Sequence, residues 1–423
     1  MIWIILTDIV LLFFGIIEGI YRVYKSERFI ERVYSEKQHN YSELYNDIVI
    51  IVPVYNEQNV IRQSFLNFKP LMDYGIEVIY VATEKEDAKV TTYALLEQLI
   101  EEYQIENYCR LLLYPKTEGV MAHQLNYAVN HIENDKIVFI YNVDSVVDIK
   151  TIDYILKNRD KLENDVFQQY SYSAYETKSH FITSAIMWQN RWSVSYELPR
   201  TIKNVKVEID KFNYVIGHGL ALRKKMLDRI GRFSEEQINE DNVLGYRLHA
   251  EQISINPVPH LEKIDFAADL KTYVKQQSVW FNGPLYAFRY FLQLRKEMND
   301  KKTVPLFFAA CQNFKNALNW MIFPYMTFVS MAYLITVKRM VLFFWIFLLL
   351  SGYVTGINRL SERILIKRGY LTHREKITFR YLITDIIFWL WIHSFGPIIT
   401  LYKIVTGQNN QKNKYKTEKV NIR

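Results

Sequence analysis

The apolar residues of this chain form long unbroken runs near its two ends and short runs in its middle. The first long run covers residues 1–21, and the acidic residues Asp8 and Glu18 interrupt it. Three more cover residues 316–337, 340–357 and 379–405. About 20 apolar residues are enough for a helix to cross a bilayer, so we predict membrane helices at both ends. For the first run, an amphipathic helix on the membrane surface is the alternative.

The stretch between the long runs has short apolar runs at residues 47–54, 76–82, 110–114 and 136–143. Stretches with helical spacing separate them, near residues 57–72, 87–103 and 121–132. Strands that alternate with helices indicate an α/β fold with a doubly wound parallel sheet. Ligands of such sheets bind at the carboxyl ends of the strands, so the loops after these strands are the candidate functional sites.

These two patterns divide the chain into five parts. Residues 281–295 mix aromatic residues with arginines, which predicts a helix lying in the membrane interface, and a second such helix is expected at residues 305–315. The expected parts are a membrane helix at 1–24, a globular domain at 25–275, interfacial helices at 276–315, membrane helices at 316–405 and a basic tail at 406–423.

The distribution of charge predicts on which side of the membrane each part of the chain lies. The net charge is +7, and much of the excess lies in residues 359–380 and in the C-terminal tail. Basic residues also follow the first apolar run between positions 22 and 32, so the positive-inside rule places the globular domain in the cytosol. A single crossing by the last apolar segment leaves the tail outside, whereas a helix break at Gly396-Pro397 returns it as a re-entrant hairpin. Both topologies stay open.

Composition argues against several classes of protein. The two cysteines, Cys109 and Cys311, are too few for a disulfide framework, and no zinc-type Cys/His spacing occurs. The basic clusters lie beside apolar segments, which favours a membrane surface over a nucleic-acid partner. Neither a GxGxxG motif nor a P-loop follows the first strand, which argues against a dinucleotide oxidoreductase and a P-loop phosphotransferase.

Six polar motifs are the candidates for chemistry. Four follow the predicted strands: PVYNE at 53–57, ATEKED at 82–87, KTEGVMAHQLN at 116–126 and YNVDS at 141–145. A longer pattern at residues 215–248 combines a Gly-rich strand, an Ile-Gly-Arg-Phe turn, a Glu-Asp pair and a downstream Gly-Tyr-Arg-Leu. The last motif is QQSVW at residues 276–280.

This set of motifs resembles the family 2 glycosyltransferases, which include the membrane-bound cellulose, chitin and hyaluronan synthases. The resemblance covers roughly residues 47–280. It implies the nucleotide-diphospho-sugar transferase (GT-A) fold for a cytosolic domain at residues 25–275, held between N- and C-terminal transmembrane helices. It also implies an enzyme of the hexosyltransferase class that uses a nucleotide-sugar donor.

The first two motifs are the base-binding side of the implied donor site. The resemblance places Pro53, Tyr55 and Glu57 around the nucleotide base. Glu84 occupies the position at which the family has an Asp that hydrogen-bonds uracil. A solvated acidic turn explains Glu84 equally well.

The next two motifs are the phosphate side of the implied donor site. Met121 occupies the position of a common phosphate-binding Lys, and Lys116 is the candidate substitute. The family's D-x-D motif reads Asn142-Val143-Asp144, so Asp144 is the expected ligand of Mg²⁺ or Mn²⁺. Asn142 offers a neutral oxygen to the cation or binds the ribose.

The long fifth motif implies the catalytic base. By resemblance, Asp241 removes the proton of the acceptor hydroxyl, with Glu240 as its neighbour. Helix capping alone explains two adjacent acids but not the whole pattern. The flanking Gly217-His218-Gly219 turn permits close approach of a ligand. His218 is either a ligand of phosphate, metal or acceptor, or a buried turn residue.

The sixth motif resembles the QxxRW motif of processive family members. Gln276 and Trp280 match it and imply an acceptor-binding site in which the Trp stacks on a sugar. Val279 replaces the Arg, which removes a bidentate phosphate donor. An interfacial anchor is the alternative role for Trp280.

The expected function is inverting, metal-dependent transfer of a sugar from a nucleotide donor, UDP-linked by resemblance, to a growing polysaccharide or a lipid-linked acceptor. The expected place is the cytosolic face of the cell membrane, in contact with lipids and with export or biosynthesis partners or further copies of the chain. The alternatives are transfer of one sugar to a polyprenyl-linked carrier, and a non-catalytic scaffold. Asn142, Met121 and Val279 are the departures that favour the scaffold.

Overall fold

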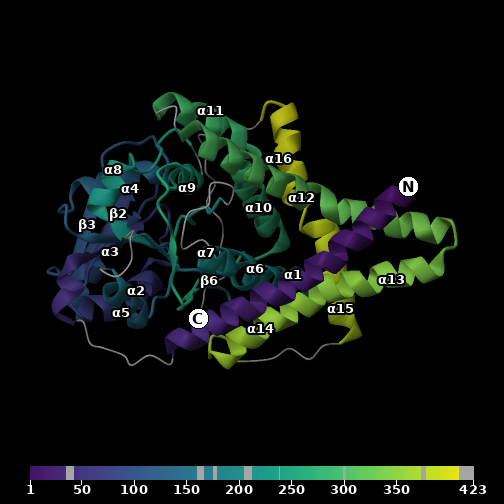
Figure 1. The fold of residues 1–423 in the computed structure, drawn as a ribbon. Coiled ribbons are helices and arrows are strands. Elements are labelled where there is room, and N and C mark those ends of the chain that lie inside the picture. Colours follow the sequence, from purple (N-terminus) through teal and green to yellow (C-terminus); the bar gives the residue numbers. More distant parts are fainter. Residues whose placement is uncertain are drawn as a thin grey trace.

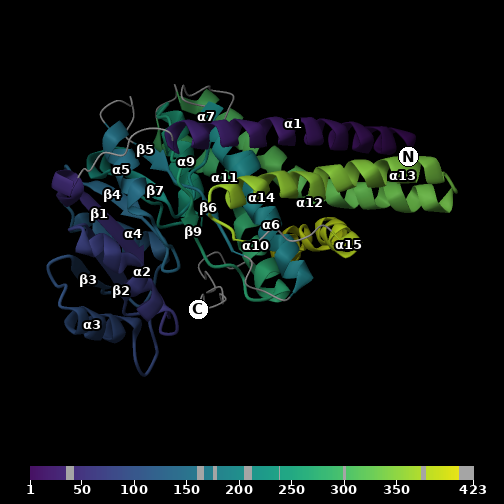
Figure 2. The ribbon, with the colours of Figure 1, turned by 90° about the horizontal axis from the view of Figure 1, so that it is seen from below.

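The computed structural model describes residues 1–34, 42–159, 166–174, 179–203, 212–237, 239–298, 302–372 and 378–408. Figures 1 and 2 show an α/β domain from which a group of long helices projects to one side. The N-terminus lies at the far end of the projecting helices (Figure 1). Most of the predicted basic tail, residues 409–423, lies outside the described residues, as does the 373–377 part of the basic segment at 359–380.

The α/β domain is built on a seven-stranded sheet in the order β3-β2-β1-β4-β7-β5-β8. Its strands are β1 (Ile48–Pro53), β2 (Glu77–Thr83), β3 (Cys109–Tyr114), β4 (Ile137–Ile140), β5 (Val166–Gln168), β7 (Leu220–Arg223) and β8 (Asn256–Pro257). The first four are parallel, as predicted, but β7 is antiparallel to both β4 and β5. The sheet is therefore mixed. Strands β6 (Ser171–Tyr172) and β9 (Glu262–Lys263) form a separate parallel pair.

Helices cover both faces of the sheet. Along β1, Ile50 and Val52 pack with α2 (Ile61–Asp73), α3 (Thr92–Tyr103) and α5 (Ile149–Asn158). The alternate residues Val49 and Ile51 pack with α4 (Met121–Asn130), α8 (Lys224–Arg229) and α9 (Glu240–Ala250). Successive strand residues point to opposite faces, so a strand that is apolar throughout requires cover on both sides. The short helix η1 (Ser42–Asp47) leads into β1. The predicted α/β class is confirmed.

Four helices of the described residues are long and apolar enough to cross a membrane: Ile2–Arg32, Thr303–Thr336, Met340–Lys367 and Phe379–Val405. They correspond to α1 (Ile2–Tyr34), α12 (Thr303–Thr336), α13 (Met340–Ser351) with η4 (Gly352–Gly356) and α14 (Ile357–Lys367), and α15 (Phe379–Ile387) with η5 (Phe388–Ile392) and α16 (Phe395–Val405). Residues 305–315, expected as a separate interfacial helix, are the first turns of α12. Residues 359–367 of the basic segment at 359–380 are the end of α14.

The last apolar segment differs from the other three. Figure 1 shows α15 and α16 running across the direction of α1, α12 and α13. Its apolar window is 56% buried inside the protein, against 22% for that of α1. The helix is interrupted at His393-Ser394, just before the predicted break at Gly396-Pro397. This segment therefore packs mainly on protein.

The remaining helices join the α/β domain to the four long apolar helices. They are α6 (His180–Trp192), the π-helix η2 (Ser193–Glu197), α7 (Leu198–Lys203), α10 (Leu270–Leu285) and α11 (Ala287–Glu297). Asp269 caps α10 by accepting a hydrogen bond from the Thr272 amide at 2.7 Å. The interfacial position expected for α10 and α11 stays a prediction.

Helix α10 and helix α16 approach each other closely at Gly396. A Cβ atom on Gly396 would lie 2.6 Å from Gln277 Cβ and 2.8 Å from the backbone nitrogen of Ser278. Thr400 Oγ1 donates a hydrogen bond to Ser278 O at 2.7 Å beside this contact. Because the obstacle includes backbone, only glycine permits this approach, and α16 thereby supports the helix that carries Gln276 and Trp280.

Substitution Gly396→Ala is expected to separate α16 from α10 and to lower the free energy of unfolding by about 1–3 kcal/mol, the usual cost of overpacking. The matched control is Gly356→Ala, since a Cβ there would meet only Ser351 O, at 3.9 Å, and the backbone there is helical. The control is expected to be neutral or stabilising by roughly 0.5–1 kcal/mol. Thermal unfolding of the detergent-solubilised protein checks both. Equal changes in the stability of the two variants would contradict the close approach of α10 and α16 at Gly396.

Candidate active site

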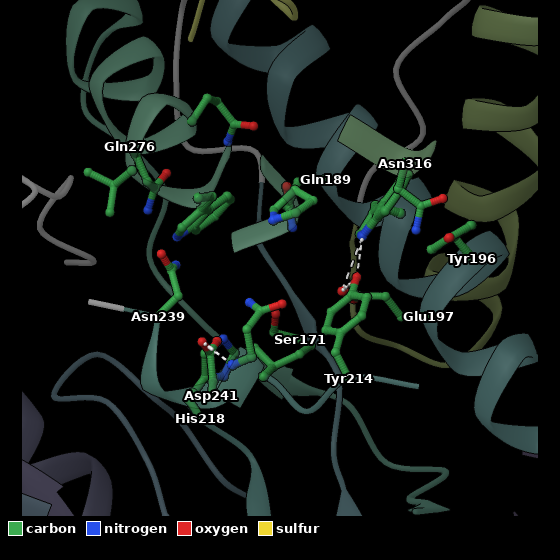
Figure 3. A pocket seen from close by; sticks show the side chains of 18 of the residues that line it. Ser171, Gln189, Tyr196, Glu197, Tyr214, His218, Asn239, Asp241, Gln276 and Asn316 are labelled. Carbon is green, nitrogen blue, oxygen red and sulfur yellow. Dashed lines mark hydrogen bonds between the residues drawn. The ribbon is translucent and has the colours of Figure 1, made fainter. Parts of the chain in front are cut away.

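A cavity of about 1200 Å³ opens at the carboxyl ends of β1, β2 and β4 and extends to the membrane helices. Figure 3 shows this cavity from close by. Most of the predicted site residues line it: Pro53, Tyr55, Glu57, Asn142, Asp144, Gly217, His218, Glu240, Asp241, Gln276 and Trp280. Glu84, Lys116 and Gly219 do not. The fold thus brings together residues that lie more than 200 positions apart in the sequence.

The donor end of the cavity is shaped by Glu86, a residue that the sequence did not single out. Its carboxylate accepts hydrogen bonds from the Asn56 amide, and from the amide and hydroxyl of Thr92 at 2.7 Å each. Asn56 has φ 54°, in the left-handed region that Asn tolerates. Glu86 therefore fixes the loop that follows β1, and with it Tyr55, against the start of α3.

Two of the predicted donor residues lie on the surface. Glu84 and Lys116 are exposed. Lys85 lies in the cavity instead, where its ammonium group is 5.4 Å from the Tyr55 ring centroid and donates to Gly119 O at 3.3 Å. A side chain beside the aromatic ring of the first motif can reach a phosphate more easily than one on the outside. Lys85 is therefore the candidate for the phosphate-binding cation, in place of Lys116.

The turn after β4 holds the candidate metal-binding residues. Asp144 is 7% exposed, and its Oδ2 accepts a hydrogen bond from the Asp265 amide at 3.1 Å. Asn142 and Ser145 are linked by two hydrogen bonds, at 3.2 and 3.1 Å, which set the turn. Asp265 also lines the cavity. Two carboxylates and an amide oxygen are hard donors that suit Mg²⁺ or Mn²⁺. In the described residues no three His, Cys, Asp or Glu side chains are grouped as a complete metal site.

His218 is held by a buried acid. Its Nδ1 is hydrogen-bonded to Glu262, whose side chain is fully buried. Gln168 donates to the His218 carbonyl at 2.8 Å. The neighbouring Gly219 has φ 65°, and a Cβ there would lie 2.5 Å from Gln169 O. The backbone conformation and the close approach of Gln169 therefore require glycine at this position. His218 is therefore an oriented turn residue that also lines the cavity, and its role as a ligand of phosphate, metal or acceptor stays a prediction.

Asp241 lies in the first turn of α9, where the helix dipole favours a carboxylate. Its Oδ1 accepts a hydrogen bond from the Asn242 amide at 2.7 Å, and a Cβ on Gly217 would lie 3.6 Å from its Oδ2. Gly217 therefore leaves room beside the carboxylate. Figure 3 shows Asp241 and His218 in the same part of the cavity. The neighbouring Glu240 is 1% exposed.

Gly245 explains why α9 lies where it does. A Cβ on Gly245 would meet Tyr214 Cα at 2.9 Å and the Val215 amide nitrogen at 3.2 Å. The helix can therefore pack directly on the chain segment that leads into Gly217. This is the physical role of the glycine in the Gly-Tyr-Arg-Leu part of the fifth motif.

The wall that leads toward the membrane helices is aromatic. Trp280 lines the cavity and is 39% exposed, with Gln276 one turn before it on α10. Trp192 and Tyr196 are stacked, with ring centroids 4.1 Å apart. Exposed and half-exposed rings of this kind are suited to stacking on the apolar faces of sugars.

Glu197 is a second acid in this wall that no sequence motif indicated. It is 8% exposed, at the end of the π-helix η2, a type of helix often found at functional sites. Its Oε1 accepts hydrogen bonds from Tyr214 Oη at 3.0 Å and Trp192 Nε1 at 3.1 Å (Figure 3). Burial raises the pKa of this carboxyl to about 7, and the hydrogen bonds from Tyr214 and Trp192 oppose that rise.

Residues 46–283 match the family model described as Glycosyltransferase like family 2. A mixed α/β sheet with a cavity at its strand ends is the architecture expected of a GT-A transferase fold. The match covers more than half of the chain, so the chain belongs to the glycosyltransferase-like family 2. It is a glycosyltransferase by class, as the motifs implied.

Several solved structures are similar to the chain at low sequence identity. The mannosyltransferase PcManGT from Pyrobaculum calidifontis, in complex with GDP-Man and Mn²⁺, is 13% identical, with 91% of this chain and 99% of that chain covered and a TM-score of 0.49. S. aureus TarS is 11% identical, with 80% and 55% covered and a TM-score of 0.43. TarS 1–349 in complex with UDP-GlcNAc is 12% identical, with 85% and 92% covered and a TM-score of 0.38. No curated protein matches the sequence.

The raised pKa of Glu197 predicts a pH-dependent stability. The folded protein holds this proton more tightly than the unfolded chain, so its stability should fall as the pH rises from about 4.5 to about 7. Substitution Glu197→Gln removes the charge and keeps an acceptor for Tyr214 and Trp192. At pH 8 the variant is expected to be more stable than the parent by up to ~3 kcal/mol, since one pKa unit corresponds to about 1.4 kcal/mol. At pH 4.5 the two should be alike.

Unfolding midpoints at pH 4.5, 6 and 8 measure this difference, with Glu133→Gln, an exposed acid, as the control. A stability difference that does not change with pH would contradict the ionisation of Glu197 in a buried site.

Proposed function

We propose that the protein transfers a sugar from a nucleotide donor, UDP-linked as the resemblance implies, to a saccharide hydroxyl, with inversion and with the help of Mg²⁺ or Mn²⁺. The acceptor is a growing polysaccharide or a lipid-linked saccharide at the cytosolic face of the cell membrane. One observation carries the proposal: a single cavity contains the donor motifs at the ends of β1 and β4 and the Asp241 carboxylate of α9.

The donor lies across the strand ends. Pro53, Tyr55 and Glu57 bind the nucleoside side, and Lys85 contacts the diphosphate. Asp144 and Asn142 would hold the divalent cation, which offsets negative charge on the departing nucleoside diphosphate.

Asp241 acts on the acceptor. Its carboxylate takes the proton of the acceptor hydroxyl while that oxygen attacks the anomeric carbon from the side opposite the diphosphate. A glycosidic C–O bond forms as the bond to the nucleoside diphosphate breaks, and the electron pair leaves with the diphosphate. Trp280 stacks on the acceptor sugar, and Glu197 and His218 offer hydrogen-bond partners to its hydroxyls.

The membrane setting follows from the four apolar helices and the basic residues after the first of them. Under the positive-inside rule the catalytic domain faces the cytosol, where nucleotide sugars are made. Export or biosynthesis partners and further copies of the chain stay predictions.

Substitution Asp241→Asn should abolish most transfer and leave the donor bound, because the amide cannot accept the hydroxyl proton. A loss of about 10²–10⁴-fold in turnover is the usual effect of removing a general base. Transfer of radiolabelled sugar and calorimetric UDP binding measure the two properties. Asp73→Asn is the control, since Asp73 is an exposed acid paired with Lys69. Near-normal turnover of Asp241→Asn would refute the assignment.

Removal of divalent metal by EDTA should abolish transfer and weaken UDP binding, and Mg²⁺ or Mn²⁺ should restore both. Asp144→Ala should bind UDP equally weakly with and without added metal. A panel of nucleotide sugars tested for donor hydrolysis identifies the donor. A wild-type chain that binds neither metal nor any nucleotide sugar would favour the non-catalytic scaffold.

A further inference from the structure

Arg191 of α6 is a buried cation for which the structure supplies no counter-ion. It is 7% exposed and lines the cavity. Its guanidinium carbon lies 4.4 Å from the Trp188 ring centroid and 4.5 Å from the Tyr353 ring centroid. Its Nη1 donates to Tyr353 O at 2.6 Å. Within the described part of the chain, Arg191 forms no ion pair with a carboxylate.

A guanidinium buried against aromatic rings forms hydrogen bonds through the N–H groups at its edge. Such an edge fits the oxygens of a phosphate, and a bound anion would remove the cost of burying the charge alone. His393 adds a second polar atom at this end of the cavity. Its ring is 4.7 Å from Trp188, and its buried Nδ1 has no hydrogen-bond partner among the described residues.

The separation between Arg191 and Asp241 can be followed along helix α12, which contacts the surroundings of both. Near its start, Asn313 donates to Asn242, the residue after Asp241, at 3.3 Å. Further along, the Phe323 ring packs on Tyr353, with centroids 5.9 Å apart, and Tyr353 covers Arg191. Phe323 lies ten positions after Asn313 in α12, which is about 15 Å along the helix axis.

The part of the cavity between these two points suits a saccharide. One face of α12 presents amide side chains to it, Asn316 and Asn319. Trp192, Tyr196 and Glu197 line the cavity as well. Amides, a carboxylate and flat aromatic rings are the groups that recognise hydroxyl-rich rings with apolar faces.

At the level of Arg191 the cavity opens between α1 and α12. Leu11 and Phe14 of α1 line it there and are 44% and 61% exposed, and Phe323 and Pro324 of α12 also line it. In Figure 1 the two helices separate from their meeting point near the N-terminus toward the catalytic domain. Because α1 is an apolar membrane helix, this opening faces the hydrocarbon region of the bilayer.

Beyond the opening, α1 and α12 contact each other. Thr327 Oγ1 of α12 donates to Asp8 of α1 at 2.6 Å. An apolar cluster of Leu12, Met331, Leu334, Ile346 and Leu350 fills the space around this contact. Apolar packing of this kind does not suit the passage of a hydrophilic polymer. An apolar chain, in contrast, can leave sideways into the bilayer.

From these contacts we infer that the acceptor is a saccharide joined through phosphate to a lipid chain. Its phosphate binds the edge of Arg191 and His393, its chain passes out between α1 and α12, and its sugar extends along Asn316 and Trp192 to Asp241. This inference rests on the proposed function, since it names the acceptor of the same reaction.

The experiment measures binding of dodecyl phosphate to the full-length protein in neutral detergent, with UDP and Mg²⁺ present so that the donor side is occupied. Dodecanol and inorganic phosphate are the comparison probes. Wild-type protein should bind dodecyl phosphate more tightly than either, because only this probe satisfies both the cation and the apolar opening. Equal binding of dodecyl phosphate and dodecanol by the wild type would overturn the inference, whatever the variants do.

Arg191→Gln should weaken dodecyl phosphate binding by about 10–100-fold, the usual worth of a hydrogen-bonded charge, and leave UDP binding unchanged. Arg28→Gln, which removes an exposed cation of α1 outside the cavity, should bind dodecyl phosphate as the wild type does. Equal weakening by the two variants would mean a general attraction to basic surface and would overturn the inference.

The dodecyl phosphate experiment can fail without refuting the proposed transferase function. Donor hydrolysis and its loss in Asp241→Asn test the transferase, whereas the alkyl phosphate tests the acceptor alone. A wild-type enzyme that makes long polymer and does not respond to dodecyl phosphate as a competitor would retain the proposed function and refute the lipid phosphate.

Discussion

The contact on which the active site depends is the meeting of three helices around Asn242. This residue begins α9 together with Asp241, and its side chain accepts a hydrogen bond from Asn313 of α12. A Cβ on Gly283 of α10 would lie 2.7 Å from Asn242 Nδ2, so glycine lets α10 come close to the same amide. The proposed catalytic base is thereby tied both to the helix that carries Trp280 and to a membrane helix. Any tilt of α10 or α12 would move Asp241 relative to the donor side.

The site also concentrates groups that are costly to bury. Asp144, Glu240, Glu197 and Arg191 are each less than a tenth exposed, and all line one cavity. Buried charge costs free energy unless a partner compensates for it, and natural proteins retain such groups mostly where they serve a ligand. Their distribution is ordered along the cavity. Asp144 and Glu240 lie where a cation is proposed to bind and a hydroxyl to react, and Glu197 lies in the wall that leads away from them. The arginine lies at the membrane end, where an anion is proposed to bind.

The departures from the family pattern acquire a physical interpretation in this arrangement. Val279 takes the place of an arginine in the sixth motif and cannot contact phosphate. Lys85 and Arg191 are cations that line the same cavity from other elements, near the donor and membrane ends respectively. A phosphate needs a positive group within reach rather than one at a fixed sequence position. The loss of the arginine therefore does not by itself make the domain a scaffold.

The sequence by itself determined the fold class, the family and the positions of the long apolar helices. It could do so because apolar runs, strand alternation and local motifs such as PVYNE and the Glu240-Asp241 pair depend on neighbours in the chain. Only the tertiary structure decided that β7 runs antiparallel, that Lys116 lies outside the cavity, and that Glu86, Glu197 and Arg191 lie in or around it. Glu86 lies in the ATEKED loop without being a predicted site residue, and Glu197 and Arg191 belong to none of the six motifs. Their significance comes from burial and from partners such as Thr92, Tyr214 and Tyr353, and those contacts exist only after distant segments have packed together.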